Sequence, residues 1–571
     1  MPTKKRLRIL SFVIILTLCI CIGGSIIKWF LGAISDNSSK RNNYNDPSNS
    51  FAEQKSSLEI EYQQYDSYVI GSSAAYDINL LNEYLDACFY NLSSNSCSVI
   101  DYYNCAAHII ENYKVDHIIL NLNINEASNY GAEKLHGSLL DPNSHICPSN
   151  EYDKQSCDIE KIGDIEIYRS THNDAFPVPQ GTINLPYIRE CVNVVADICT
   201  LCAKNGVDLI VIETPIYSSV WHSYEPAELR TYKEALAKVV SYWDFSFTSI
   251  SNDCRYFYDV YHFRKAVGTM ILAEVFGNSD IYRPSDFGTF VSAENCSSYL
   301  NKLFSSCSTS NDTSYTKNVP ILMYHHFTNE IFADTCVSPA NFEMQIRALA
   351  ESGYTAVSFP EMIDYVYHGG SLPAKPVCIT IDDGYYSNYQ IAYPILKKYG
   401  MKATIFAIGS SVGHMEYYKD TTYPIIPHFS YDNAREMVDS GVIDFQSHSY
   451  DMHQWRDFED NELVRSSMLP LDGESEFAYA KALKNDMALY EAIRIQELGK
   501  GFCALSYPGG FYNDLVETLV HEAGIPATVS IRTDSSNILI RGLPQSLYAL
   551  CRMNVTDNTT VDELLNYVSG Q

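Results

Sequence analysis

The chain has little positive charge for its length. Its 571 residues include 40 lysines and arginines against 69 aspartates and glutamates, which gives a formal charge of -29. Such an acidic chain repels nucleic acids and anionic lipid surfaces, so we expect no nucleic-acid partner. The length exceeds that of a single core and predicts two large folded units.

The chain also lacks a pair of CxxC motifs, since Cys199 and Cys202 form the one spacing of this kind. Its 17 cysteines are scattered, which argues against a zinc–cysteine module. Two of them lie in the apolar run described next, and the odd number that remains argues against a complete disulfide framework. Cys147 and Cys157, like Cys296 and Cys307, are close enough in sequence for local disulfides, with buried free thiols as the alternative.

Only one apolar run is long enough to cross a bilayer, at residues 9–27. The preceding tail, residues 1–8, is basic and is expected to stay in the cytoplasm. No clear cleavage site follows, which favours an uncleaved anchor over a signal peptide. We therefore predict a single-pass cell-membrane protein whose stalk, residues 28–57, and folded domains lie outside the cytoplasm.

Residues 58–291 alternate between strand and helix patterns, which predicts a parallel sheet. Residues 292–318 are rich in Ser, Thr and Asn and are expected to form a linker. The expected strands are Ser67–Ser73, Val115–Asn123 and Val207–Pro215, and the expected helices include Tyr76–Tyr90, Leu185–Asn205 and Ala266–Phe276.

Three short motifs in this first domain carry a resemblance. They are Gly71-Ser72-Ser73, Asn125-Glu126 and Asp259-Val260-Tyr261-His262. With them the domain resembles the SGNH hydrolase superfamily, in its membrane-associated, acyltransferase-like branch. The resemblance implies a three-layer α/β/α, flavodoxin-like fold. Ser72 and Glu126 depart from the family pattern, so a domain that has lost catalysis and only binds glycan stays an alternative.

The resemblance also assigns roles. Ser73 would be the nucleophile, His262 its base, Asp259 the group that orients the histidine, and Asn125 an oxyanion donor. Acyl transfer by a serine needs these residue types, because a hydroxyl must lose its proton as a charged oxygen forms on the substrate.

Residues 319–571 form a second series of strands alternating with helices, which predicts a (β/α) barrel. Polar residues fall repeatedly at the ends of its strands. The buried run Val377–Gly384 stops on Asp382 and Asp383, and another strand stops on His448. These ends should meet at one rim of the barrel, where such folds hold their active sites.

Asp383, His448 and His453 together supply one carboxylate and two imidazoles, a common ligand set for catalytic Zn²⁺. The spacing of the histidines does not suit a helix and places them on a strand-to-loop corner. Asp382 then remains free to act as a base on water held by the metal.

These residues lie in motifs similar to those of the polysaccharide deacetylases, the carbohydrate esterase group with the NodB homology fold. The matching segments are Thr380–Gly384, His448–His453, Leu322–His325 and Ser506–Tyr512. The resemblance implies a distorted (β/α) barrel of NodB type. It also implies a backbone amide at Gly509 that holds the oxyanion.

Two departures from that family concern catalysis. Ser506 stands where the family has a groove arginine, and residues 547–555 lack the histidine that acts as general acid in many members. The general acid is therefore unassigned, and His325 and His326 either line the site or pack in the core.

The leading hypothesis is a membrane-anchored, metal-dependent N-deacetylase of an N-acetylglucosamine polysaccharide, with a first domain that acts on O-acyl groups. One alternative is a glycan-binding or assembly protein with decayed sites. The other is an enzyme whose main activity is that of an SGNH O-acetyl esterase or acyltransferase.

Overall fold

The computed structural model describes residues 65–78, 87–93, 97–128, 176, 181–306, 315–417, 423–459, 463–532 and 537–570. The expected anchor and stalk lie outside the described residues. Within the described ranges, no helix combines the length and the apolar character needed to cross a membrane. Cys296 is a buried free thiol, and the other cysteines of the two expected disulfides lie outside the described ranges.

The first domain contains a six-stranded sheet in the order β2-β1-β3-β4-β5-β6, parallel except for the antiparallel pair of β5 and β6. Its strands are β1 (Ser67–Ile70), β2 (Phe89–Asn91), β3 (His117–Leu122), β4 (Asp208–Glu213), β5 (Tyr242–Asp244) and β6 (Thr289–Val291). Its helices are α3 (Val99–Asn112), α6 (Ile188–Asn205), α7 (Ser218–Trp221), α8 (Pro226–Ala237), α9 (Lys265–Val275) and α10 (Cys296–Ser306).

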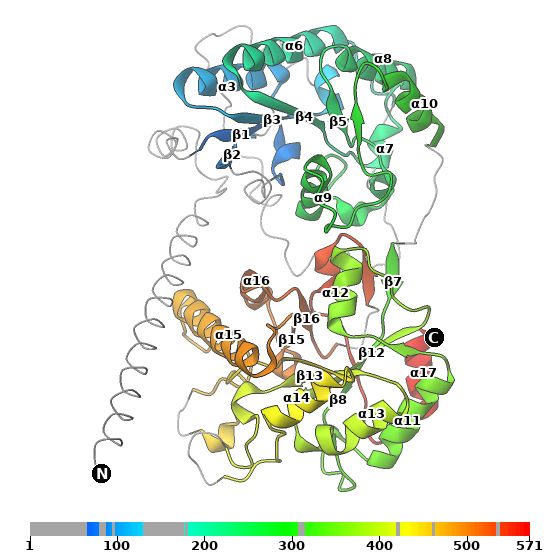
Figure 1. Cartoon of the computed structure of the whole chain (residues 1–571), viewed down its shortest axis with the longest axis vertical. Helices are drawn as coiled ribbons and strands as arrows, with labels where there is room; N and C mark the ends of the chain where they lie inside the picture. Colours follow the sequence, from blue (N-terminus) through cyan, green and yellow to red (C-terminus); the bar gives the residue numbers. More distant parts are fainter. Residues whose placement is uncertain are drawn as a thin grey trace, which may run out of the picture. The chain divides into compact units, whose positions relative to one another are not determined.

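Helices cover both faces of this sheet. Helices α3, α6 and α8 pack side by side over one face (Figure 1). On the other face, Val267 and Ile271 of α9 pack against Val69 and Ile119 of the strands. The central strands are buried on both sides, as the continuous apolar runs predicted. The domain is thus a three-layer α/β/α structure.

Two expectations for this part of the chain need correction. The expected helix Tyr76–Tyr90 ends in the edge strand β2, which pairs with β1 in parallel. The expected linker 292–318 contains a helix, α10, whose Cys296 contacts the backbone of Lys233 in α8. Its Leu300 and Leu303 are buried, and these two apolar residues among serines and asparagines are enough to seat the helix.

The second domain is built on a parallel sheet in the order β16-β15-β14-β13-β12-β8-β18, and β11 also pairs with β12. Its strands are β7 (Thr316–Asn318), β8 (Ile321–Tyr324), β9 (His326–Phe327), β10 (Cys336–Val337), β11 (Thr355–Ala356), β12 (Pro376–Asp383), β13 (Ala403–Ala407), β14 (Ile443–Ser447), β15 (Ala504–Ser506), β16 (Ala527–Val529), β17 (Ile538–Ile540) and β18 (Met553–Asn554). Its helices are α11 (Pro339–Glu351), α12 (Phe359–Tyr367), α13 (Tyr393–Lys398), α14 (Tyr431–Asp439), α15 (Glu476–Leu498), α16 (Asp514–Glu522) and α17 (Val561–Ser569).

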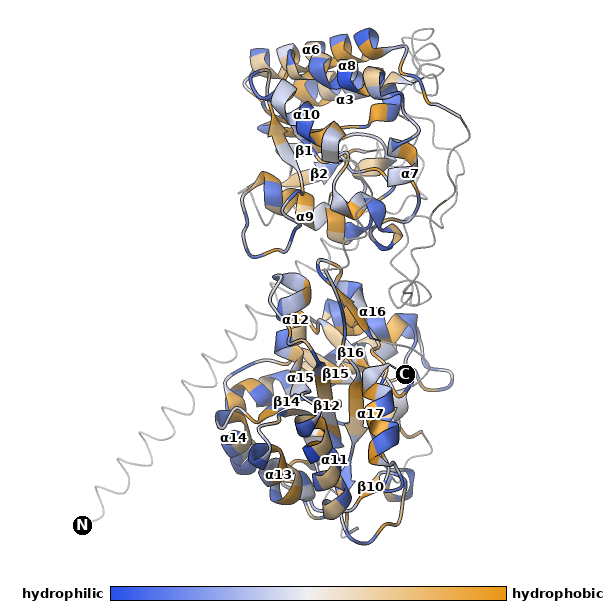
Figure 2. Cartoon of the chain, turned by 90° about the vertical axis from the view of Figure 1, so that its right-hand side faces the viewer, coloured by the Kyte–Doolittle hydropathy of each residue, from blue (hydrophilic) through white to orange (hydrophobic). Residues whose placement is uncertain are grey.

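The edges of this sheet approach each other through one segment of chain. Val529 of β16 forms a parallel bridge with Leu550, and β18, three residues further on, pairs with β8. The sheet therefore curves into a distorted (β/α) barrel, as expected. Helices surround it, and α17 carries both hydrophilic and hydrophobic colouring, typical of an amphipathic surface helix (Figure 2).

Strand β12 lies in the interior of this sheet. All eight of its residues are buried, and it pairs in parallel with both β8 and β13. Because β8, β13, β14 and β15 run in the same direction, their carboxyl ends meet at the edge where β12 ends on Asp382 and Asp383. The fold thus gathers the polar strand ends at one rim.

Candidate metal centre and candidate serine site

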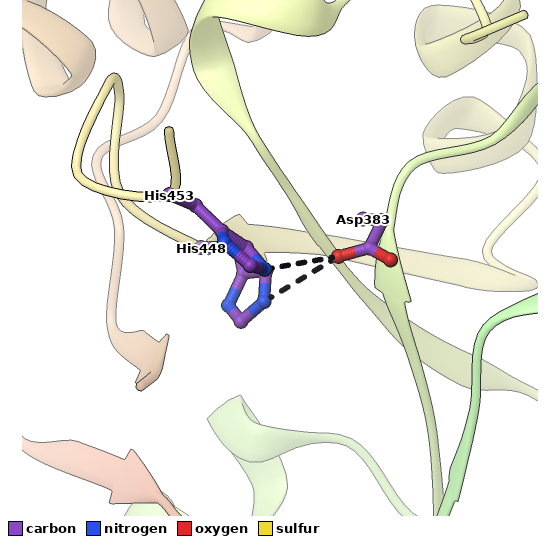
Figure 3. Close-up of side chains that lie close together, drawn as sticks. All are labelled: Asp383, His448 and His453. Atoms are coloured by element: carbon purple, nitrogen blue, oxygen red, sulfur yellow. Dashed lines mark ion pairs between the residues drawn. The ribbon is translucent and has the colours of Figure 1, made fainter. Parts of the chain in front are cut away.

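Asp383, His448 and His453 lie together at the rim of the barrel (Figure 3). Oδ1 of Asp383 lies 3.6 Å from Nε2 of His448 and 3.8 Å from Nε2 of His453. One donor atom from each residue lies within 4.8 Å of the others. Donors at about 2.1 Å around a tetrahedral Zn²⁺ are about 3.4 Å apart. The three side chains therefore fit a divalent metal with little movement.

Hydrogen bonds fix the orientation of His448. Its Nδ1–H donates to the carbonyl oxygen of Ser506 at 2.8 Å, which leaves the lone pair of Nε2 facing Asp383. The turn toward His453 is held from α15, where the carboxylate of Asp486 accepts hydrogen bonds from the amides of Tyr450 and Asp451, both at 2.8 Å.

The backbone is strained at two points of this site. Among the described non-glycine residues, only Asp383, Ser449 and Ala549 have a positive φ, at 73°, 65° and 44°. Asp383 is one of the three residues facing the metal position, and Ser449 follows His448. Left-handed backbone at such residues is costly and concentrates at functional sites.

Asp382 is buried beside this group, and its Oδ2 lies 4.0 Å from Nε2 of His448. Its carboxylate forms two hydrogen bonds with the Arg552 guanidinium, at 2.7 Å and 2.8 Å, and accepts a third from Ser506 Oγ at 3.1 Å. Burial alone would raise the pKa of Asp382, but the charge and hydrogen bond of Arg552, together with His448 and His325, more than offset it, so the pKa lies below its usual range. Asp382 is therefore held as a carboxylate.

Sequence reasoning missed Arg552. It lies in the segment expected to supply an acid histidine, and its side chain is fully buried. Besides Asp382 it contacts Ser506 Oγ at 2.9 Å, Thr380 Oγ1 at 3.2 Å and the carbonyl of Ser530 at 2.9 Å. The available signal was a lone arginine in an apolar segment, because a buried guanidinium requires an anionic partner.

The structure distinguishes the two neighbouring histidines. His325 follows β8 directly, and because Tyr324 pairs with Ile381, it lies beside Asp382. It is 9% exposed, and its buried Nδ1 has no hydrogen-bond partner among the residues that the structure describes. Burial lowers the pKa of His325, and the nearby carboxylates of Asp383 and Asp382 act in the opposite direction. His326 instead bonds through Nδ1 to Ser387 Oγ at 2.9 Å.

Comparison with known proteins identifies the family. A model of the polysaccharide deacetylase family matches residues 369–528. The protein YxkH of Bacillus subtilis (strain 168), which is named for the same family, is 31% identical over 238 residues, covering 42% of this chain and 71% of YxkH. The chain belongs to the polysaccharide deacetylase family. It is therefore a hydrolase of a family that acts on carbon–nitrogen bonds.

Further relatives carry more specific names. The poly-beta-1,6-N-acetyl-D-glucosamine N-deacetylase of Staphylococcus aureus (strain MRSA252) is 26% identical over 203 residues, which are 36% of this chain and 63% of that protein. The chain thus spans less than two thirds of that relative. A solved de-N-acetylase from Aggregatibacter actinomycetemcomitans is 22% identical, with a TM-score of 0.37, covering 44% of this chain and 100% of that one.

Within the deacetylase domain, Gly509 lies in a short 3₁₀ turn (Pro508–Gly510) directly after β15. Its φ of 66° is the left-handed conformation that glycine adopts without strain. The expected oxyanion donor therefore lies on the same rim as Asp382, since β15 also carries Ser506, the hydrogen-bond partner of Asp382.

A second group of catalytic residue types lies in the first domain of this deacetylase. Ser73 follows β1, and its Oγ lies 2.8 Å from Nε2 of His262. Nδ1 of His262 lies 2.7 Å from the carboxylate of Asp259. That carboxylate also accepts hydrogen bonds from the amides of Tyr261 and His262, at 2.7 Å and 2.9 Å. The structure thus brings the three predicted residues into one hydrogen-bonded chain.

Helix α9 and the serine turn are in direct backbone contact. A Cβ atom on Gly268 would lie 2.0 Å from the carbonyl oxygen of Asp77, so only glycine allows this approach. His262 precedes α9 and Ser73 precedes Asp77 along the chain. Gly268 therefore helps to bring the histidine to the serine.

Asn125 follows β3, the strand next to β1, so it lies near the same edge of the sheet as Ser73. Tyr224 donates its hydroxyl hydrogen to Oδ1 of Asn125 at 2.9 Å. This bond occupies the amide oxygen of Asn125, so its amide nitrogen is the group left to act as a donor.

Proposed function

We propose that the second domain removes N-acetyl groups from an N-acetylglucosamine polysaccharide, and that it needs a divalent metal to do so. The observation that carries the proposal is the arrangement of Asp383, His448 and His453 beside a carboxylate, Asp382, that is bonded to Arg552. The two imidazoles and one carboxylate suit Zn²⁺. When bound, the metal would polarise the substrate carbonyl and make a water molecule more acidic.

The remaining steps follow from the side chains. Asp382 takes a proton from the attacking water, and Arg552 and Ser506 hold its carboxylate in place. The Gly509 amide donates to the carbonyl oxygen as its charge develops. As the carbon–nitrogen bond breaks, His325, beside Asp382, takes over the proton that Asp382 received from the water and gives it to the departing nitrogen, and this fills the role that the sequence left unassigned.

Acetate release tests this proposal. The purified full-length chain should release acetate from β-1,6-linked N-acetylglucosamine oligomers, lose that activity to a chelator and regain it with Zn²⁺. Asp383→Ala should abolish release, because it removes one of three ligands, whereas Ser73→Ala should retain it. Equal release by Asp383→Ala and the wild type would show that the proposed centre is not the site.

A second candidate function is hydrolysis or transfer of an O-acyl group at Ser73. The chain of hydrogen bonds from Ser73 through His262 to Asp259 favours it. Ser73 would attack the ester carbonyl and pass its proton to His262, and the acyl group would later move to water or a sugar hydroxyl. A fluorophosphonate probe should label the wild type and not Ser73→Ala. Labelling that is equal in both would refute it.

The apolar run at residues 9–27 would hold both sites at the outer face of the cell membrane. The full-length chain should then fractionate with membranes, and a chain that begins at residue 58 should not. Recovery of the full-length chain in the soluble fraction would refute the anchor.

A further inference from the structure

Large apolar side chains are exposed around the rim of the metal centre. They lie in segments that follow β9, β12, β13, β14 and β15, and Asp383 lies at the carboxyl end of β12. The exposed fractions are 64% for Phe332, 39% for Tyr386, 43% for Tyr423, 42% for Trp455 and 59% for Phe511. Exposing so many rings to water is unfavourable unless a ligand covers them.

Two of these rings, Tyr423 and Trp455, stack with the partly buried Phe458, and we name the three rings the aromatic ledge. The centroid of Phe458 lies 5.2 Å from that of Tyr423 and 5.9 Å from that of Trp455. The planes are inclined by only 14° and 11°. The ledge is thus a row of nearly parallel rings with Phe458 at its centre.

The two loops that carry the ledge are tied together. Tyr417 donates its amide hydrogen to the carbonyl of Tyr423 at 2.9 Å and its hydroxyl hydrogen to Glu459 at 2.5 Å. Gln454, next to Trp455, exchanges two hydrogen bonds of 2.9 Å with the backbone of Arg465. The rings are therefore held in place before any ligand arrives, which lowers the entropic cost of binding.

The ledge is close to the metal centre. Trp455 is two residues beyond His453, so the two Cα atoms are at most about 7 Å apart. Charged and amide side chains alternate with the rings along Gln454, Trp455, Arg456, Asp457 and Phe458. Rings for an apolar face and polar groups for hydroxyls are what a pyranose requires. The charge of -29 disfavours an anionic lipid surface as the occupant.

From this geometry we propose that the aromatic ledge binds a neighbouring hexosamine ring of the polymer whose acetyl group is removed at the metal centre. This rests on the proposed N-deacetylase function and adds a subsite to it. The enzyme then acts on oligomers much better than on the single sugar, because only an oligomer reaches both the ledge and the metal.

Substrates of different length separate binding at the aromatic ledge from reaction at the metal centre. With N-acetylglucosamine hexamers, Trp455→Ala should raise KM about tenfold or more with kcat little changed, because the stack contacts a ring that does not react. Trp455→Phe should recover most of the loss. With N-acetylglucosamine itself, Trp455→Ala and the wild type should be equal. Phe477→Ala, which removes an 81% exposed ring on α15, is the matched control and should change neither substrate.

Three results would refute the proposal that the aromatic ledge binds a sugar ring. One is an unchanged KM for the hexamer, and another is an equal loss on the monomer, which would mean that Trp455 acts through His453. The third is Trp455-dependent binding to neutral lipid vesicles without binding to hexamers. If the wild type releases no acetate from any oligomer, the N-deacetylase function fails, and calorimetric binding of the hexamer decides the ledge. Equal affinity of wild type and Trp455→Ala would then refute it, and a loss of affinity in Trp455→Ala would support it.

Discussion

Replacing Arg552 by methionine should damage both stability and catalysis. Methionine keeps much of the side-chain length but removes the guanidinium that bonds both oxygens of Asp382. Arg552 is 0% exposed and Asp382 is 1% exposed. Among the described residues, the buried carboxylate would thus keep only the Ser506 hydroxyl as a hydrogen-bond donor. Breaking a buried ion pair in this way costs about 3–5 kcal/mol of unfolding free energy.

The loss depends on pH in a defined direction. The pKa of Asp382 is lowered in the folded state, so its pairing stabilises the protein above pH about 4 and less as the pH falls further. The stability gap between wild type and Arg552→Met should therefore be full at pH 7 and shrink in acid. Urea unfolding at pH 7 and pH 3 measures it.

Activity should fall for a related reason. Without Arg552 the base is neither oriented nor held as a carboxylate, and general bases contribute about 10²–10⁴-fold to rate. We expect kcat for acetate release to drop at least about a hundredfold with KM little changed. Arg347→Met is the matched control, because Arg347 is 54% exposed and its contact with Glu351 is 3.9 Å.

A double variant decides whether the unpaired charge of Asp382 causes the loss of stability in Arg552→Met. Adding Asp382→Asn to Arg552→Met removes the unpaired carboxylate, so the double variant should be more stable than Arg552→Met alone. If the two are equally unstable, the loss comes from packing and the electrostatic reasoning is refuted. Retained kcat in Arg552→Met would refute the role in orienting the base.

Three further predictions follow from single contacts. Gly268→Ala should abolish fluorophosphonate labelling of Ser73 and leave acetate release unchanged, because the added Cβ meets the Asp77 carbonyl at 2.0 Å; retained labelling would contradict this. Asp486→Asn should weaken Zn²⁺ binding about 10–100-fold in a chelator competition, because one amide of the His453 turn loses its acceptor. Burial raises the pKa of Glu126 to about 8, so stability should fall as the pH rises from about 4 to 8. Glu126→Gln should flatten that profile in urea unfolding, and an unchanged slope would contradict it.

The strands were the most predictable part of the fold. The runs expected at Val115–Asn123, Val207–Pro215 and Val377–Gly384 became β3, β4 and β12, because continuous β-branched and apolar residues suit strands buried on both faces. The edge strand β2 was missed, since Phe89 and Tyr90 also fit a helical pattern and only pairing with β1 selects the strand. A tertiary contact therefore selected the strand where the local sequence pattern fitted both helix and strand.

The residues of the metal centre also include some that the sequence could predict and some that it could not. Asp382 and Asp383 are adjacent, and His448 and His453 share one turn, so short motifs could predict them. Arg552 lies 170 residues from Asp382 along the chain, and no local pattern joins the two. The sequence left the role of His325 undecided for the same reason, because that role depends on which strand lies beside β8.

The relation between Ser506 and Arg552 shows what the motif alone conceals. A serine where related enzymes carry a groove arginine suggested a weakened site. In the structure that serine accepts a hydrogen bond from Arg552 at 2.9 Å and donates one to Asp382, so both reach the same carboxylate, Ser506 from β15 and Arg552 from the segment just before β18. A small residue at position 506 leaves the space that a guanidinium from position 552 occupies. The departure from the motif is therefore evidence for a relocated positive charge, and it argues against the alternative of a decayed site.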